Sequence, residues 1–283
     1  MSRSLKKVLK KVIPLSIRQA LKKKSFLIST QDIRETLSLA ENSDTRDILQ
    51  KVNRRVNVND NMYDAAGGAQ YLGIGLSALK YIEIAIAEMN VKPIQKILDL
   101  PCGYGRVLRI LTRRFPDCQF TACDTEREAV DFCSKEFGAK PLYSQTNLKE
   151  FNVGEQYDLI WCGSLATHLD KEGTIELLRF FNRHLASGGL LVFTMHGQFS
   201  LGKLRTGEFD YGLPPESVAK IIKDTETTGY GYADYPDTTG YGISVASTDW
   251  INARLHEIDK WKDYRFYSTA WANNHDIYAL VKE

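Results

Sequence analysis

The stretch ILDLPCGYGRVLRIL, residues 97–111, joins two apolar runs through a short loop that contains Gly103 and Gly105. The first run belongs to a predicted strand over 96–100, and the second has the spacing of a helix over 105–115. Because glycine has no Cβ, such a loop can turn sharply and let its backbone approach a ligand closely. The first turn of the helix offers free N–H groups, so the sequence predicts a ligand site where this strand ends.

Strands and helices alternate along the chain on both sides of this stretch. After a helix over 70–89, the predicted strands are 96–100, 119–123, 141–144, 156–163 and 188–196, and the predicted helices are 105–115, 126–137 and 171–185. This order predicts a parallel sheet with helices on both faces. Residues 264–272 and 276–282 follow as strands separated only by NNH, which demands an antiparallel hairpin. The expected fold is α/β, a Rossmann-like, doubly wound, seven-stranded mixed sheet with a C-terminal antiparallel hairpin.

The N-terminal residues form a separate unit in this interpretation. Residues 1–31 carry nine lysines and arginines and no acid, and residues 4–24 have apolar positions at helical spacing around Pro14. Three roles stay open for such an amphipathic helix: contact with an anionic membrane surface, docking on its own domain, or docking on a partner. Residues 31–61 are polar and predict a connector or partly ordered arm with a helix over 45–56. We therefore divide the chain into a basic helical extension, 1–60, and a domain, 61–283.

Residues 197–247 lack clear periodicity and are crowded with Gly, Thr, Asp and Tyr. They predict a long loop region that acts as a lid or binding wall, followed by a helix with Thr248 as its N-cap. Tyr230, Tyr232 and Tyr241 would suit a sugar or other polyhydroxyl acceptor, because aromatic faces stack on rings while hydroxyls pair. The alternative is that these tyrosines pack the insertion onto the sheet.

Composition narrows the class of protein. The formal charge of +2 divides into nine basic residues in 1–31 and 28 basic against 35 acidic residues in the rest of the chain, a difference of −7, so we expect no nucleic-acid partner. The five cysteines form no CxxC pair and predict reduced thiols in a cytoplasmic protein, and we expect no metal site. No apolar stretch reaches the roughly 18–20 residues that span a bilayer.

Two acids restrict the ligand. Asp99 ends the first strand of the sheet and Asp124 follows the second, where a carboxylate can accept hydrogen bonds from a ribose diol. The third glycine of a dinucleotide loop is replaced by Leu108, and a carboxylate at the strand end suits an ammonium group better than a pyrophosphate. Asp124 alone could instead cap the helix that starts near Glu126. Together the residues favour a nucleoside with a cationic, amino-acid-like tail, as in S-adenosylmethionine.

Here the chain resembles the class I S-adenosylmethionine-dependent methyltransferases. DLPCGYGR (99–106) matches the family's DxGCGxGR motif with Pro101 where Gly is usual, and ACDTE contains the ribose acid. DLIWCGSLATHL (158–169) and LASGGLLVFT (185–194) match its later strand motifs. A narrower resemblance, in DLPCGYGRVLR, IWCGSLATHL, FTMHG and YGISVAS, is to bacterial methyltransferases of glycan and glycosyltransferase systems.

The resemblance implies a set of cofactor-binding residues. Gly103 and Gly105 would line the methionine part, Asp124 would hold the ribose, and the residues after the third strand would border the adenine. The full set is Tyr71, Gly73, Asp99, Pro101, Cys102, Gly103, Gly105, Arg106, Asp124, Thr125, Ser144, Gln145, Gly163, Ser164 and Leu165.

His168 and His196 follow the fourth and fifth strands, so either is a candidate general base for a hydroxyl acceptor. Otherwise His168 hydrogen-bonds a loop backbone and His196 orients the Tyr-rich segment. His184, His256 and His275 are interpreted as structural or surface residues. The expected function is O-methylation of a saccharide or glycan hydroxyl, in the cytoplasm or at the inner membrane face. The alternatives are N- or carboxyl-methylation of a small metabolite, or a non-catalytic module that binds S-adenosylmethionine.

Overall fold

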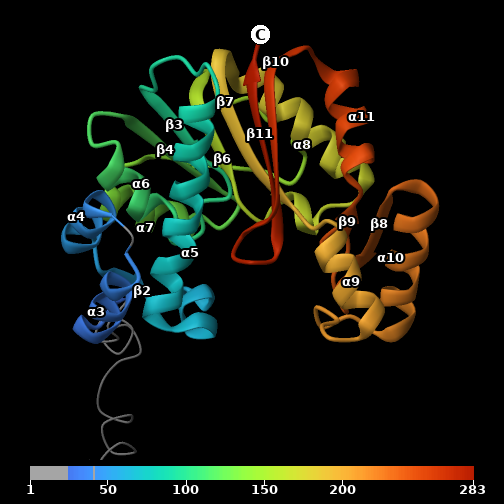
Figure 1. Ribbon diagram of the computed structural model, residues 1–283, viewed down its shortest axis with the longest axis horizontal. Coiled ribbons are helices and arrows are strands. Elements are labelled where there is room, and N and C mark those ends of the chain that lie inside the picture. Colours follow the sequence, from blue (N-terminus) through green and yellow to red (C-terminus); the bar gives the residue numbers. More distant parts are fainter. Residues whose placement is uncertain (1–24, 41) are drawn as a thin grey trace, which may run out of the picture.

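The computed structural model describes residues 25–40 and 42–283, and its centre is a seven-stranded mixed sheet of order β10-β11-β7-β6-β3-β4-β5. Its strands are β3 (Lys96–Asp99), β4 (Gln119–Asp124), β5 (Lys140–Tyr143), β6 (Tyr157–Cys162), β7 (Leu185–Met195), β10 (Trp261–Trp271) and β11 (His275–Lys282). β3 to β7 are parallel, and β11 is antiparallel to both β7 and β10. The predicted fold class, with its terminal hairpin, is confirmed (Figure 1).

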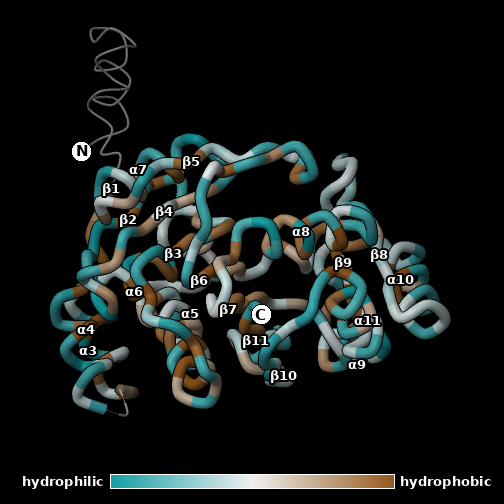
Figure 2. Tube along the Cα trace, turned by 90° about the horizontal axis from the view of Figure 1, so that it is seen from above, coloured by the Kyte–Doolittle hydropathy of each residue, from teal (hydrophilic) through white to brown (hydrophobic). Residues whose placement is uncertain are grey.

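Helices cover both faces of the sheet because neighbouring strand residues point to opposite sides. Ile97 packs with α5 (Asn61–Glu88), α6 (Leu108–Arg114) and α7 (Arg127–Phe137), whereas Leu98 packs with α8 (Lys171–His184) and α11 (Thr248–Ile258). Figure 2 shows apolar residues gathered along the sheet and the helices that cover it. The result is a three-layer α/β domain whose parallel strands end at one common edge.

Residues 25–40 and 42–57 are folded onto this domain. β1 (Ser25–Leu27) pairs with β2 (Arg55–Asn57), and α3 (Thr30–Ser38) and α4 (Ser43–Lys51) lie between them in the chain. Ile28 and Val56 are fully buried in the same core cluster as residues of α5 and α6. The expectation of a connector or partly ordered arm is therefore wrong, and the helix predicted over 45–56 ends at Lys51. The amphipathic segment 4–24 lies outside the described residues, and the division at residue 60 stays a prediction.

Residues 197–247 are also more regular than predicted. They form α9 (Gln198–Thr206), α10 (Pro215–Thr228), β8 (Tyr230–Asp234) and β9 (Gly242–Ala246) around a small core of their own. Both helices end at a glycine with positive φ, Gly207 and Gly229, which the sequence did not distinguish from loop glycines. The prediction of a long loop region is wrong. Ser247, and not Thr248, is the N-cap of α11.

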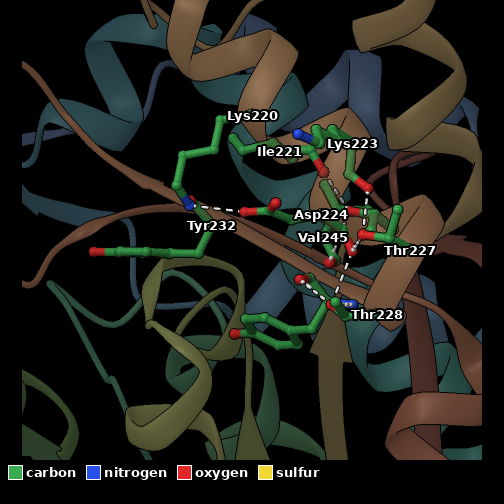
Figure 3. Close-up of polar contacts among 10 residues, drawn as sticks. Lys220, Ile221, Lys223, Asp224, Thr227, Thr228, Tyr232 and Val245 are labelled. Atoms are coloured by element: carbon green, nitrogen blue, oxygen red, sulfur yellow. Dashed lines mark hydrogen bonds and ion pairs between the residues drawn. The ribbon is translucent and has the colours of Figure 1, made fainter.

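The helix α10 is fastened to the β8–β9 hairpin by polar contacts (Figure 3). Lys220 Nζ lies 2.9 Å from Asp224 Oδ2 on its own helix and donates to the Tyr232 carbonyl of β8 at 2.8 Å. The carbonyl of Ile221 lies so close to β8 that a Cβ on Gly231 would be 2.1 Å from it. The insertion is therefore a compact unit that can hold β9 in a fixed place.

Two units flank the carboxyl ends of the strands (Figure 1). One consists of α3, β2 and the first half of α5, and the other of α9, α10, β8 and β9. In the described part of the chain, no helix is both long and apolar enough to cross a membrane.

Candidate active site

The loop after β3 has the sharp turns that its glycines predict. Gly103 and Gly105 have φ of +46° and +77°, a region that side chains rarely adopt. A Cβ on Gly105 would lie 2.3 Å from Cε2 of Phe137, so a side chain has no room there. The Leu100–Pro101 peptide is cis. Cys102 is nearly buried, and its N–H donates to the carbonyl of Cys123 at 2.9 Å, which joins the loop to β4.

Asp124 at the end of β4 holds this loop directly. Its Oδ2 accepts from the Gly103 N–H at 2.8 Å, and its Oδ1 accepts from the Glu126 N–H at 3.0 Å and from the Thr125 hydroxyl at 3.5 Å. Asp124 therefore satisfies backbone donors ahead of α7 and also stands beside the glycine loop. The alternative that it caps the helix is wrong, because the N-cap of α7 is Glu126 and no side chain caps that helix. A ribose role is compatible with both contacts, because a carboxylate has about four lone-pair sites.

Asp99 and Arg106 are two ionisable groups near this loop that make no hydrogen bond to a described residue. Asp99 is 1% exposed, and neither carboxylate oxygen has a hydrogen-bond partner in the described part of the chain. Burial raises its pKa well above the usual value, the Asp124 charge raises it further, and Arg106 opposes both. The Arg106 guanidinium lies 5.5 Å from the ring centre of Trp271 and makes no hydrogen bond or ion pair to a described residue.

An unpaired buried carboxylate is costly unless a ligand supplies its partner. The amino-acid end of S-adenosylmethionine has an ammonium group and a carboxylate, which are complementary to Asp99 and Arg106 respectively. The residues present therefore fit this cofactor, and the orphaned Asp99 oxygens are the observation on which that fit rests.

The remaining predicted cofactor residues lie after neighbouring strands. The Ser144 N–H donates to the Asp124 carbonyl at 2.8 Å, whereas Gln145 is exposed and its side chain donates to a loop carbonyl. Gly163 follows β6, and a Cβ there would lie 2.9 Å from the Trp161 ring. Ser164 has φ of +66°, and its N–H donates to Thr194 Oγ1 at 2.8 Å. The Leu165 carbonyl accepts from the His168 N–H in the next turn.

Tyr71 and Gly73 both lie on α5. Tyr71 is fully buried, its hydroxyl donates to Asp60 Oδ2 at 2.6 Å, and it also accepts from Arg109. Tyr71 therefore lies in the core and is linked through Arg109 to the Gly105 and Tyr104 carbonyls of the loop, and its role toward the cofactor stays a prediction. Gly73 lines a 620 Å³ cavity between α5, the α3–α4 segment and the β10–β11 turn.

Arg109 was missed by the sequence analysis. It is fully buried on α6, and its Nε donates to the Gly105 carbonyl while Nη1 donates to the carbonyls of Asn53 and Arg55. This guanidinium connects residues 53–55 to the glycine loop. In the sequence, the only indication that Arg109 is buried is its place among the apolar residues of VLRILTRR.

His168 and His196 are both held by the free edge of β9. One edge of β9 pairs with β8, and on the other edge the carbonyls of Gly242 and Ser244 lie 2.8 Å from His168 Nδ1 and 3.1 Å from His196 Nδ1. A carbonyl oxygen only accepts, so each Nδ1 carries the hydrogen and each Nε2 of the neutral ring has a lone pair. The insertion therefore fixes the same tautomer in both histidines, in the form that accepts a proton at Nε2.

The surroundings of the two histidines differ. The His168 ring is stacked on Tyr241, with ring centres 4.8 Å apart, and it also contacts Tyr235. His196 is 2% exposed, and its Nε2 has no partner among the described residues. Burial lowers the pKa of His168, and burial together with the His168 charge lowers the pKa of His196 to about 3.

The three predicted acceptor tyrosines have different positions. Tyr241 is 44% exposed, and burial of the rest of its side chain together with the Asp124 charge raises its pKa. Tyr232 is half-buried, and its hydroxyl donates to Asp234. Tyr230 is buried against Trp250 with its hydroxyl hydrogen-bonded to Thr174. The burial of Tyr230 supports the alternative that it packs the insertion onto the sheet.

The sequence predicted a structural or surface role for His275. In the structure its side chain is buried beside that of His196. It begins β11, is 8% exposed, and its ring centre lies 4.6 Å from that of His196. Its Nδ1 lies 3.1 Å from Thr194 Oγ1. All five cysteines are free thiols, and the described residues contain no cluster of ligands that could hold a metal ion.

Comparisons with known proteins agree with this architecture. Residues 98–191 match the model of the Methyltransferase domain family. The malonyl-[acyl-carrier protein] O-methyltransferase of Acetivibrio thermocellus is 25% identical over 119 residues, which are 41% of this chain and 41% of that protein. This chain therefore spans less than half of that relative's length.

Solved structures show the same fold. A sugar N-methyltransferase, KedS8 from a Streptoalloteichus species, has a TM-score of 0.53 at 16% identity, over 79% of this chain and 92% of that one. A S-adenosylmethionine-dependent methyltransferase from Clostridium acetobutylicum has a TM-score of 0.51 at 15% identity, over 78% and 96%. Residues 98–191 are thus similar to a methyltransferase domain, and the sheet has the class I fold that the sequence predicted.

Proposed function

We propose that the protein methylates a hydroxyl group of a saccharide, with His168 as the general base. The observation that carries this proposal is the position of His168, whose Nδ1 donates to the Gly242 carbonyl and whose ring lies against the exposed ring of Tyr241. A hydroxyl acceptor must lose its proton, and a neutral imidazole with a free Nε2 is suited to take it.

Asp99, Arg106 and Asp124 would hold the cofactor at its ammonium, carboxylate and ribose groups. When bound, S-adenosylmethionine supplies a methyl group on a sulfonium, which is a good leaving group. The protein then has to bring the acceptor oxygen into line with that methyl group and exclude water. Gly103 and Gly105 allow the backbone to approach the cofactor, and the nearly buried Asp99 indicates that little water remains at its ammonium end.

The aromatic group Tyr235–Tyr241–His168 supports a saccharide acceptor. Tyr241 is stacked on the candidate base, and 44% of its surface is exposed, so a sugar ring can stack on it with a hydroxyl close to His168. We place this reaction in the cytoplasm, with residues 4–24 available for contact with the inner face of the membrane.

The test is methyl transfer from labelled S-adenosylmethionine to separate panels of methyl glycosides, carboxylic acids and amines. His168→Ala should reduce kcat on a glycoside by about 10²–10⁴-fold, the usual contribution of a general base. His256→Ala, on the exposed side of α11, is the matched control and should leave kcat unchanged. Transfer to glycosides that His168→Ala does not slow would overturn the role of the base.

The specific alternative is methylation of a carboxylate, which the similarity to a malonyl-[acyl-carrier protein] O-methyltransferase favours. A carboxylate needs no base, so label should then enter only the acid panel, and His168→Ala should retain nearly all turnover. Amine methylation would place the label in the third panel. Cofactor binding without transfer to any panel would favour a non-catalytic module.

A further inference from the structure

The pair His196 and His275 carries an inference that rests on the proposed function and makes its acceptor more specific. Both rings lie at the carboxyl end of the sheet, His196 directly after β7 and His275 at the start of the neighbouring β11. Their ring centres are 4.6 Å apart with a 76° angle between the planes. Neither residue is needed for the removal of a proton by His168.

Hydrogen bonds fix opposite roles for the two Nε2 atoms. His196 Nδ1 donates to the Ser244 carbonyl, so its Nε2 is an acceptor, and this buried atom has no partner in the described part of the chain. Thr194 is fully buried, and its hydroxyl oxygen already accepts from the Ser164 N–H. The one described group left to receive the Thr194 hydrogen is His275 Nδ1, 3.1 Å away.

His275 Nδ1 is therefore an acceptor, and the hydrogen of the neutral ring is on Nε2. No described residue accepts from this N–H. The site thus presents one free acceptor and one free donor on adjacent, uncharged rings, since burial lowers the pKa of both histidines. A hydroxyl group both donates and accepts, whereas a carboxylate only accepts and an ammonium group only donates.

Two further features match a sugar. The rings of Tyr211 and His196 lie 4.8 Å apart, and Phe209, 53% exposed, lies next to Tyr211, so aromatic surface continues from this pair to solvent. The β9 carbonyls that hold His168 and His196 are two residues apart, roughly 6–7 Å along a strand. One sugar ring can span that separation.

We propose that His196 and His275 form a subsite for a second, non-reacting hydroxyl group of the acceptor. This hydroxyl group donates to His196 Nε2 and accepts from the N–H of His275 Nε2. The acceptor is then a polyhydroxyl compound such as a saccharide, and this pair positions it so that a different hydroxyl reaches His168. His196 has a positioning role here and not the role of base.

The test combines acceptor analogues with variants of the full chain. Methyl glycosides of common hexoses are compared with their monodeoxy analogues, and KM and kcat are measured for each. For the glycoside that is methylated fastest, removal of one hydroxyl other than the methylated one should raise KM about tenfold, the value of one hydrogen bond. The KM ratio is the KM of the deoxy analogue divided by the KM of the parent glycoside. In His275→Phe, which keeps an aromatic ring beside Trp271, this ratio should fall to about 1.

Controls separate recognition from folding. His275→Gln keeps an N–H donor and should restore part of the KM ratio, whereas His256→Phe on the surface should leave the wild-type ratio. In ¹⁵N-histidine spectra of the wild-type protein with S-adenosylhomocysteine, the accepted glycoside should shift the Nε2 signals of His196 and His275. Equal KM ratios in wild type and His275→Phe would overturn the subsite.

The two proposals can fail separately. If the wild-type protein methylates no glycoside but glycosides still shift both Nε2 signals, the subsite stands and the proposed function falls. If glycosides are methylated, but the ratio and the signals do not respond as stated, the proposed function stands and the subsite falls. Glycosides that are neither methylated nor able to shift either signal would refute both.

Discussion

Replacing Asp99 by Asn should stabilise the cofactor-free protein while it weakens cofactor binding. Asp99 is buried, its carboxylate oxygens have no partner among the described residues, and burial raises its pKa. An unsatisfied buried polar group costs about 1–3 kcal/mol, and a charged one costs more. Because Asn carries no charge, Asp99→Asn should gain at least about 1 kcal/mol at pH 7.5, which raises Tm by roughly 2–4 °C.

The difference in Tm between Asp99→Asn and the wild type should depend on pH. Near pH 3.5 the carboxyl is largely protonated in the folded and the unfolded wild type, so both proteins should have similar Tm values. As the pH rises past about 3.9, the unfolded chain ionises first, and the wild type loses stability until the pH passes the raised pKa of the folded state. The variant has no such group, so its advantage should increase over this range and then stay constant.

Binding should change in the opposite direction. Loss of a buried charged partner costs about 2 kcal/mol or more, so calorimetry should show Kd for S-adenosylmethionine raised about 30-fold or more in Asp99→Asn. Asp124→Asn is the matched control, because Asp124 satisfies the N–H groups of Gly103 and Glu126. That variant should also bind the cofactor weakly, but its Tm should fall. A lower Tm for Asp99→Asn at pH 7.5, or an unchanged Kd, would refute this reasoning.

Three further predictions concern the loop and the acceptor side. Gly105→Ala should destabilise the protein by about 2 kcal/mol or more in urea unfolding, since its Cβ meets Phe137 at positive φ, whereas Gly103→Ala has open space and should cost about 1 kcal/mol. Tyr241→Ala should raise KM for a glycoside more than it lowers kcat in steady-state assays, and an equal effect on both would contradict stacking. The acid limb of kcat/KM should lie below pH 6.5, because burial lowers the pKa of His168, and a pH–rate profile of His168→Ala should lack it.

The parts that sequence predicts well are those determined by local pattern. The alternation of strands and helices from residue 96 to 196 and the NNH turn led to the observed sheet, and Asp99 and the glycine loop lie at the predicted strand end. Apolar periodicity and glycine conformation act over a few residues, so a single sequence contains them.

The parts that sequence missed depend on contacts between distant residues. The hairpin β8–β9 packs its apolar residues against α9 and α10, and the histidines that satisfy the free edge of β9 come from distant parts of the chain. Arg109 is buried because the carbonyls of residues 53 and 55 lie opposite it, more than fifty residues earlier in the chain. Tyr230 and Tyr241 occur in one tyrosine-rich run, but only the fold decides that one is core and the other exposed.

Membrane contact by residues 4–24 remains a proposal, and the structure shows where to cut the chain to test it. Ile28 is fully buried and its N–H donates to the Arg54 carbonyl, so deletion of residues 1–24 preserves the β1–β2 pair, whereas a cut after residue 28 would remove β1. The full chain should sediment with vesicles that contain phosphatidylglycerol, because each basic residue near such a surface contributes about 1 kcal/mol. Binding should weaken as salt shortens the Debye length from about 10 Å at 0.1 M to about 3 Å at 1 M. The truncated chain, whose charges sum to 28 basic against 35 acidic residues, should stay in solution with an unchanged Tm. If it sediments with the vesicles as the full chain does, the basic segment is not the membrane contact.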